Sequence, residues 1–130
     1  MKITHLNPDT LYKSPAFSQG VSVEGATRLI FVGGQNGITA DGKLAGDDLG
    51  AQSEQALKNV LEVLKAAGAD QTNVVKLTIY IVQGQDARVG FGAAQKIWGA
   101  HPTAISVPIV AALGVPGALV EIDAVAVVEA

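Results

Sequence analysis

Cysteine is absent from the 130 residues of this chain, and charged and aromatic residues are scarce, at 16% and 5%. Without cysteine, the protein can form no disulfide, no thiolate metal site and no thiol nucleophile. No apolar run is longer than a strand, so we expect no membrane-spanning segment and no membrane partner. The N-terminus lacks the apolar region of a secretory signal peptide, and we expect a cytoplasmic protein.

The charged fraction lies well below the roughly 25% of typical globular domains. A small domain with too few charges to cover its surface often buries part of it against copies of itself, so we expect self-association. The formal net charge is −3, and no run of lysine or arginine occurs. Nucleic-acid binding normally requires a basic patch, and this charge pattern argues against a nucleic-acid partner.

The length and the 48% of hydrophobic residues predict one folded domain over residues 1–130. Runs rich in β-branched and apolar residues predict strands near residues 20–23 and over 27–32, 74–82, 104–113 and 119–128. We expect Gly25 and Ala26 to form a hairpin turn between the first two strands, and Gly33 to Gln35 to end the second. Pro108 indicates an edge or a bulge in the fourth.

Two segments show helical spacing. An apolar stripe over residues 57–64 predicts a first helix, with Asp47 or Asp48 as its N-cap and Gly68 just beyond its end. A second helix is expected from about Asp86 to Trp98, weakened by three glycines. Phe91 and Trp98 share one face of it and are expected in the core.

The resulting order, β-β-α-β-α-β-β, predicts an α+β fold with a mixed sheet and both helices on one face. The opposite face of the sheet must then be covered, and a neighbouring copy of the chain is a natural cover.

The residues alone leave the chemistry open. Gly33 and Gly34 follow a strand, where they could cradle a phosphate or form a tight turn. Glu121 and Asp123 share one face of a strand, as an acid–base pair or as two solvated acids. His101 is more often a helix-end residue than a base, and no spacing suggests a metal site.

Six segments occur in an order typical of one family: residues 14–20 (SPAFSQG), 31–35 (FVGGQ), 52–61 (QSEQALKNVL), 66–69 (AAGA), 74–80 (VVKLTIY) and 120–126 (VEIDAVA). With them the chain resembles the Rid family of reactive intermediate deaminases, also called the YjgF or L-PSP family. The resemblance implies a chorismate-mutase-like fold, a homotrimer, and small-molecule clefts between subunits. Family members hydrolyse enamines and imines such as 2-aminoacrylate to a ketoacid and ammonia, without a metal or a cofactor.

The family's central arginine lies in a Pro-Ala-Arg-Ser segment, where its guanidinium binds the substrate carboxylate, and a glutamate on the last strand handles a proton or the attacking water. The resemblance therefore implies one catalytic residue, Glu121. It also implies six substrate-binding residues, which are Phe17, Gly33, Gly34, Phe91, Ile105 and Ser106.

The sequence departs from the family where it would bind a carboxylate. Ile105 replaces the arginine, and no arginine follows Arg88. Phe17 stands at the position of a cleft tyrosine, Phe91 falls near that of an asparagine, and Gly33 replaces a serine. A cleft so changed would bind α-imino or α-keto acids poorly, because hydrogen bonds to charged groups are worth about 1.5–3 kcal/mol each.

Three functions follow. The first is a hydrolase or deaminase of a reactive enamine, imine or related metabolite unlike 2-aminoacrylate, with Glu121 as acid or base. The second is a trimer that binds a small, fairly apolar molecule and catalyses nothing. The third is a ribonuclease or translation inhibitor, which the acidic charge disfavours.

Overall fold

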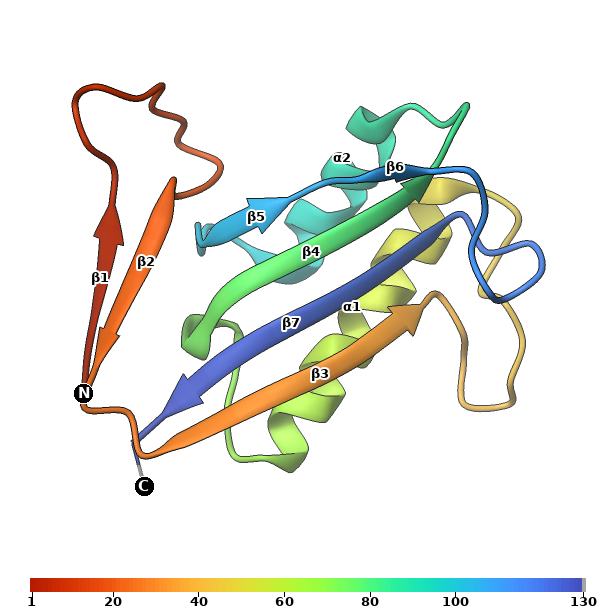
Figure 1. Cartoon of the computed structure of the whole chain (residues 1–130). Helices are drawn as coiled ribbons and strands as arrows, with labels where there is room; N and C mark the ends of the chain where they lie inside the picture. Colours follow the sequence, from red (N-terminus) through yellow and green to blue (C-terminus); the bar gives the residue numbers. More distant parts are fainter. Residues whose placement is uncertain (130) are drawn as a thin grey trace.

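The computed structural model describes residues 1–129, which form a five-stranded sheet, two helices packed on one of its faces, and a separate two-stranded hairpin (Figure 1). The strands are β1 Lys2–Leu6, β2 Gly20–Glu24, β3 Arg28–Asn36, β4 Val74–Val82, β5 Ala104–Ser106, β6 Ile109–Val110 and β7 Val120–Val128. The helices are α1 Leu49–Ala66, α2 Ala87–Trp98 and the short 3-10 helix η1 Gln71–Asn73. The α+β fold with a mixed sheet is confirmed. Within the described part, neither long helix is apolar enough to cross a bilayer.

The main sheet has the order β3-β7-β4-β5, with β6 also paired to β4. Strands β3, β7 and β4 are antiparallel, whereas β5 and β6 run parallel to β4. The prediction of one continuous strand over 104–113 is wrong, because the segment forms two short strands, β5 and β6. The interruption includes Pro108, which has no N–H to donate to β4. Its carbonyl instead accepts a hydrogen bond from the Ile81 N–H at 3.0 Å.

The expected hairpin between the first two predicted strands is also wrong. Strand β2 pairs with β1, a strand that the sequence reasoning missed, and β3 pairs with β7. Gly25 does turn the chain, with φ +74°, but the turn carries it from one sheet to the other. Strand β3 then continues to Asn36 instead of ending at Gly33, through an irregularity in its register between Val32 and Gln35.

Both predicted helices are confirmed. The side chain of Asp48 caps α1 by accepting a hydrogen bond from the Ala51 N–H at 2.8 Å. Gly68 follows its last turn with φ +75°, and the N–H groups of Gly68 and Ala69 bond back to the carbonyls of Lys65 and Leu64. This pair of hydrogen bonds is the Schellman motif, which is common at helix ends that are followed by glycine.

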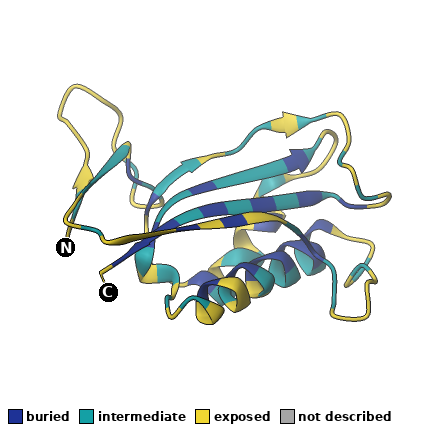
Figure 2. Ribbon diagram, turned by 60° about the horizontal axis from the view of Figure 1, so that its bottom comes forward, coloured by how far each residue is buried: buried dark blue, intermediate teal, exposed yellow. Residues whose placement is uncertain are grey.

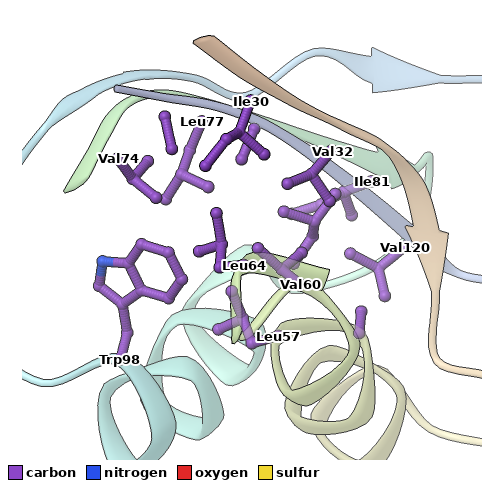
Figure 3. Close-up of a cluster of buried hydrophobic side chains, with 14 of the residues drawn as sticks. Ile30, Val32, Leu57, Val60, Leu64, Val74, Leu77, Ile81, Trp98 and Val120 are labelled. Carbon is purple, nitrogen blue, oxygen red and sulfur yellow. The ribbon is translucent and has the colours of Figure 1, made fainter. Parts of the chain in front are cut away.

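The core lies between the helices and the sheet (Figures 2 and 3). Alternate residues of β7, from Val120 to Val128, face α1 and are buried. Trp98 is buried as expected, but Phe91 remains 43% exposed, so the expectation that it belongs to the core is wrong. No helix or strand of residues 1–129 covers the other face of the sheet, where Phe31 is 71% exposed (Figure 2).

One polar side chain ties α1 to the loops that end near it. Gln52 is fully buried, at 0% exposure. Its amide nitrogen donates to the carbonyls of Gly46 (2.9 Å) and Gly117 (3.1 Å), and its oxygen accepts from the Leu119 N–H (2.7 Å). A buried amide so fully bonded fixes the loop before α1 and the start of β7 in one arrangement.

We expect Gln52→Met to lower the free energy of unfolding by about 2–5 kcal/mol, because it keeps the volume but leaves three backbone groups without their partner. Urea denaturation measures the change. Glu62→Ala, at an exposed position of the same helix, is the control and should change stability by less than about 0.5 kcal/mol. Equal stability of the two variants would contradict this role for Gln52.

Candidate functional site

A cavity of about 600 Å³ opens between α2, the loop before β2 and the helix-facing side of β4 and β5. Three predicted substrate-binding residues, Phe17, Phe91 and Ile105, line it together. They come from the loop, from α2 and from β5, so the fold brings together side chains that are far apart in the sequence. The volume lies in the roughly 300–1,000 Å³ range typical of small-molecule sites.

The cavity wall is almost entirely apolar. Its lining residues are Pro15, Ala16, Phe17, Leu57, Leu77, Ile79, Phe91, Ala94, Gln95, Trp98, Gly99, Ala100, His101, Pro102, Ile105 and Val107. None of them is aspartate, glutamate, lysine or arginine. The sequence reasoning missed the contribution of β4, although Leu77 and Ile79 alternate with exposed-face residues, a signal that could have placed them beside Ile105.

Backbone and side-chain hydrogen bonds hold the loop that carries Phe17 against β5. The Ser18 N–H donates to the carbonyl of Thr103 at 2.9 Å, and Ser18 forms an isolated bridge with Ala104. Thr103 is itself buried and donates through its hydroxyl to the Val74 carbonyl at 3.0 Å. Ser18 also bonds the His5 ring through its hydroxyl at 2.7 Å. These contacts fix one wall of the cavity.

The predicted catalytic residue lies on the other face of the sheet. Glu121 alternates with Val120 and Ile122, which are buried beneath the helices. Its carboxylate lies against the backbone of Gly34, because a Cβ added to that glycine would meet Oε2 at 2.6 Å. Gly34 therefore provides the space that the Glu121 side chain occupies. Gly33 leaves open space, with nothing within 4 Å of an added Cβ.

Ser106 also lies on the uncovered face. It stands opposite Thr78 in the β4–β5 register, next to Ile105, which faces the cavity. Its hydroxyl accepts a hydrogen bond from the Lys76 ammonium at 2.6 Å. The predicted site residues thus fall into two groups, which one chain does not bring together. Phe17, Phe91 and Ile105 line the cavity, and Glu121, Gly34 and Ser106 lie on the opposite face of the sheet.

Neither arginine lines the cavity. Arg28 donates to the Ala67 carbonyl at 2.8 Å, beyond the end of α1. Arg88 is exposed and holds Asp86, the α2 N-cap, through Nε at 3.1 Å and Nη2 at 3.0 Å. These hydrogen bonds lower the pKa of Asp86. Within one chain, then, neither guanidinium reaches the cavity around Ile105.

Together, the fold and the cavity define a small α+β protein with a ligand-sized apolar pocket and a separate carboxylate beside a glycine bulge. Residues 9–128 match the family described as Endoribonuclease L-PSP, and the chain belongs to this family, the Rid or YjgF family. It is 38% identical over 117 residues to the 2-iminobutanoate/2-iminopropanoate deaminase of Rattus norvegicus, covering 86% of this chain and 80% of that protein. The Homo sapiens protein of the same name is 37% identical over 112 residues, covering 85% and 79%.

Solved structures agree with the family assignment. A Rid-family protein from Yersinia pestis, YyfB, has a TM-score of 0.86 and 36% sequence identity, covering 98% of this chain and 100% of that one. A Mycobacterium tuberculosis member of the YjgF/YER057c/UK114 family has a TM-score of 0.67 and 29% identity, covering 98% and 100%.

We expect Gly34→Ala to push the Glu121 carboxylate aside and to destabilise the fold by about 1 kcal/mol, a modest cost because the displaced atoms are the end of a flexible side chain. Gly33→Ala is the matched control and should change stability by less than about 0.5 kcal/mol. Urea denaturation gives the stabilities, and the NMR shift of the Glu121 carboxyl carbon reports its displacement. In a Glu121→Ala background the cost of Gly34→Ala should disappear. The same cost in both backgrounds would show that the clash is not with Glu121.

Proposed function

We propose that this protein is a Rid-type hydrolase of a reactive imine or enamine that carries no carboxylate, acting in clefts between the subunits of a homotrimer. The observation that carries the proposal is the apolar cavity around Ile105, which offers no cation to an acidic substrate. The relatives named as deaminases of 2-iminobutanoate and 2-iminopropanoate support the reaction class. The change at Ile105 supports a different substrate within that class.

The division of the site residues supports a cleft shared between copies. A cavity on the helix side of one chain and Glu121 on the uncovered face of the same chain are separated by the sheet. A second copy that laid its uncovered face over the cavity would supply the carboxylate. The exposed Leu29 and Phe31 on β3 and the low charge of the chain favour burial of that face against another copy.

The proposed reaction requires only a proton carrier and a bound water. The Glu121 carboxylate accepts a proton from water as the water oxygen bonds to the imine carbon. The nitrogen takes up that proton, which gives a carbinolamine. Glu121 then removes the hydroxyl proton and passes it to the amine nitrogen, the carbon–nitrogen bond breaks with its electron pair going to nitrogen, and ammonia leaves as the carbonyl forms. The sum is imine plus water giving ketone or aldehyde plus ammonia. One carboxylate can serve as base and then as acid in such a sequence.

A second candidate is a binding protein without catalysis. Ile105 favours it directly, because the side chain that grips the substrate in the family is replaced by one that can only make apolar contacts. The same cavity would then hold an apolar metabolite unchanged. Turnover separates the two candidates.

Diphenylmethanimine is a suitable test substrate, since it is uncharged and its hydrolysis to benzophenone and ammonia is followed by absorbance. We expect the protein to accelerate the reaction over buffer. Glu121→Gln should slow it by roughly 10²–10⁴-fold, the usual contribution of acid–base catalysis. Glu62→Gln, on the exposed side of α1, is the control. No acceleration over buffer, with the substrate still bound, would favour the binding protein.

Mixed assemblies test whether the site is shared. Glu121→Gln removes the carboxylate, and Ala94→Trp fills the cavity. Co-expression of the two inactive variants should restore about a quarter of the sites, those that combine an intact cavity with an intact Glu121 from a neighbouring copy. No recovery would contradict a site shared between copies.

We expect Ile105→Arg to raise the affinity for pyruvate at least about tenfold, because each hydrogen bond to a charged group contributes about 1.5–3 kcal/mol. Titration calorimetry measures the gain. Ile109→Arg adds the same charge at an exposed position outside the cavity and serves as the control. An unchanged affinity would mean that Ile105 does not correspond to the family arginine or that Phe17 and Phe91 obstruct the guanidinium.

A further inference from the structure

The large cavity has one polar end. Gln95 and His101 contribute the only polar side chains of the wall apart from the indole of Trp98, whose N–H already donates to the His101 carbonyl at 3.3 Å. Both belong to the last turn of α2 or to the loop that follows it. The rest of the wall is formed by aliphatic and aromatic side chains, among them Leu77, Phe91 and Ile105.

The fold fixes the backbone of His101 and leaves its ring without a hydrogen bond. The indole N–H of Trp98 donates a hydrogen bond to the His101 carbonyl. Two residues further on, the buried Thr103 is held by two hydrogen bonds, one at its hydroxyl and one at its carbonyl. The ring lines both the large cavity and a smaller one of about 130 Å³. Among residues 1–129, neither the His101 ring nor the amide of the exposed Gln95 has a hydrogen-bond partner, so both can bond a ligand.

Local charge at this end of the cavity opposes an anion. The C-terminal end of a helix carries about half a negative elementary charge, and Gly99 to His101 directly follow that end of α2. Asp70 lies close by. Hydrogen bonds from the hydroxyl and the N–H of Thr72 lower the pKa of its carboxyl, so Asp70 is ionised at neutral pH. A carboxylate here would lie near the negative pole of α2 and the ionised Asp70, and no lysine or arginine lines the cavity.

We infer that this cavity binds a hydrophobic molecule that has an N–H group and no carboxylate, with the nitrogen at His101 and Gln95 and the apolar body against Phe91 and Ile105. A neutral imidazole nitrogen and an amide oxygen both accept hydrogen bonds from such an N–H. The inference rests on the proposed function in taking the same cavity as the ligand site. It assigns His101 as a specificity-determining residue.

The size of the cavity defines the apolar body. An apolar cavity of about 150 Å³ binds benzene. The cavity here is about 600 Å³ and accommodates a fused or substituted ring system. The ligand is therefore larger than the three- and four-carbon imino acids named for the deaminase relatives.

Two probes of equal shape test the inference on the full chain in its native assembly, namely 2-naphthamide, which is neutral with an N–H donor, and 2-naphthoate, which is anionic. Fluorescence titration gives both dissociation constants without any turnover. We expect the amide to bind at least about tenfold more tightly than the acid. His101→Leu should weaken amide binding by about three- to tenfold, the effect of one hydrogen bond, and His101→Gln should restore part of it. Glu62→Gln, at an exposed position of α1 that lines neither cavity, should leave both constants unchanged.

Tighter binding of the acid, or no binding of either probe, would overturn the proposed ligand class. An amide preference that His101→Leu does not reduce would overturn the role of His101. The result is separable from the proposed hydrolysis. If diphenylmethanimine is not hydrolysed but the amide binds as expected, the proposed reaction fails and the ligand class stands. If diphenylmethanimine is hydrolysed but the amide binds no more tightly than the acid, the reaction stands and the ligand class fails.

Discussion

The pleat of the sheet determines on which of its two faces each site residue of this protein lies. Neighbouring residues of a strand point to opposite faces. Ile105 therefore enters the cavity while Ser106 faces away from it, and Ile122 enters the core while Glu121 does not. Because the helices cover only one face, a single chain separates an apolar recognition surface from a proton-carrying group. Any chemistry that needs both must use more than one copy of the chain.

The sequence predicts much of the secondary structure because its strongest signals are local. The apolar stripe and caps of α1 and the β-forming run of β4 depend on neighbouring residues, and both were predicted almost to the residue. Strand pairing depends on distant residues. Gly25 shows that the chain turns, but nothing near it shows that β2 pairs with the N-terminal strand instead of β3. Pro108 was read as an edge or a bulge, and it divides one predicted strand into β5 and β6.

The sequence predicts which residues belong to the candidate site, but it does not predict how they lie relative to one another. The family resemblance points to Phe17, Phe91 and Ile105, and the cavity brings them together. The resemblance does not show that Gly34 leaves space for the Glu121 carboxylate, since that contact depends on the register between β3 and β7. It also gives no reason to consider His101, because a histidine before a proline at the end of a helix usually has a structural role.

The departures from the family pattern make physical sense together. A lone exchange of arginine for isoleucine would leave a cavity built for an anion with nothing to bind it. Here the whole wall around Ile105 is apolar, and the polar end combines the negative pole of α2, the ionised Asp70 and free hydrogen-bond acceptors. The uncovered face, in contrast, carries Glu121 beside Gly34, two residues that the resemblance assigns to the family site. Since the two groups lie on opposite faces of the sheet, recognition can change without disturbing the carboxylate that would move protons. The proposed change of ligand and the proposed hydrolysis would therefore depend on different faces of the same sheet.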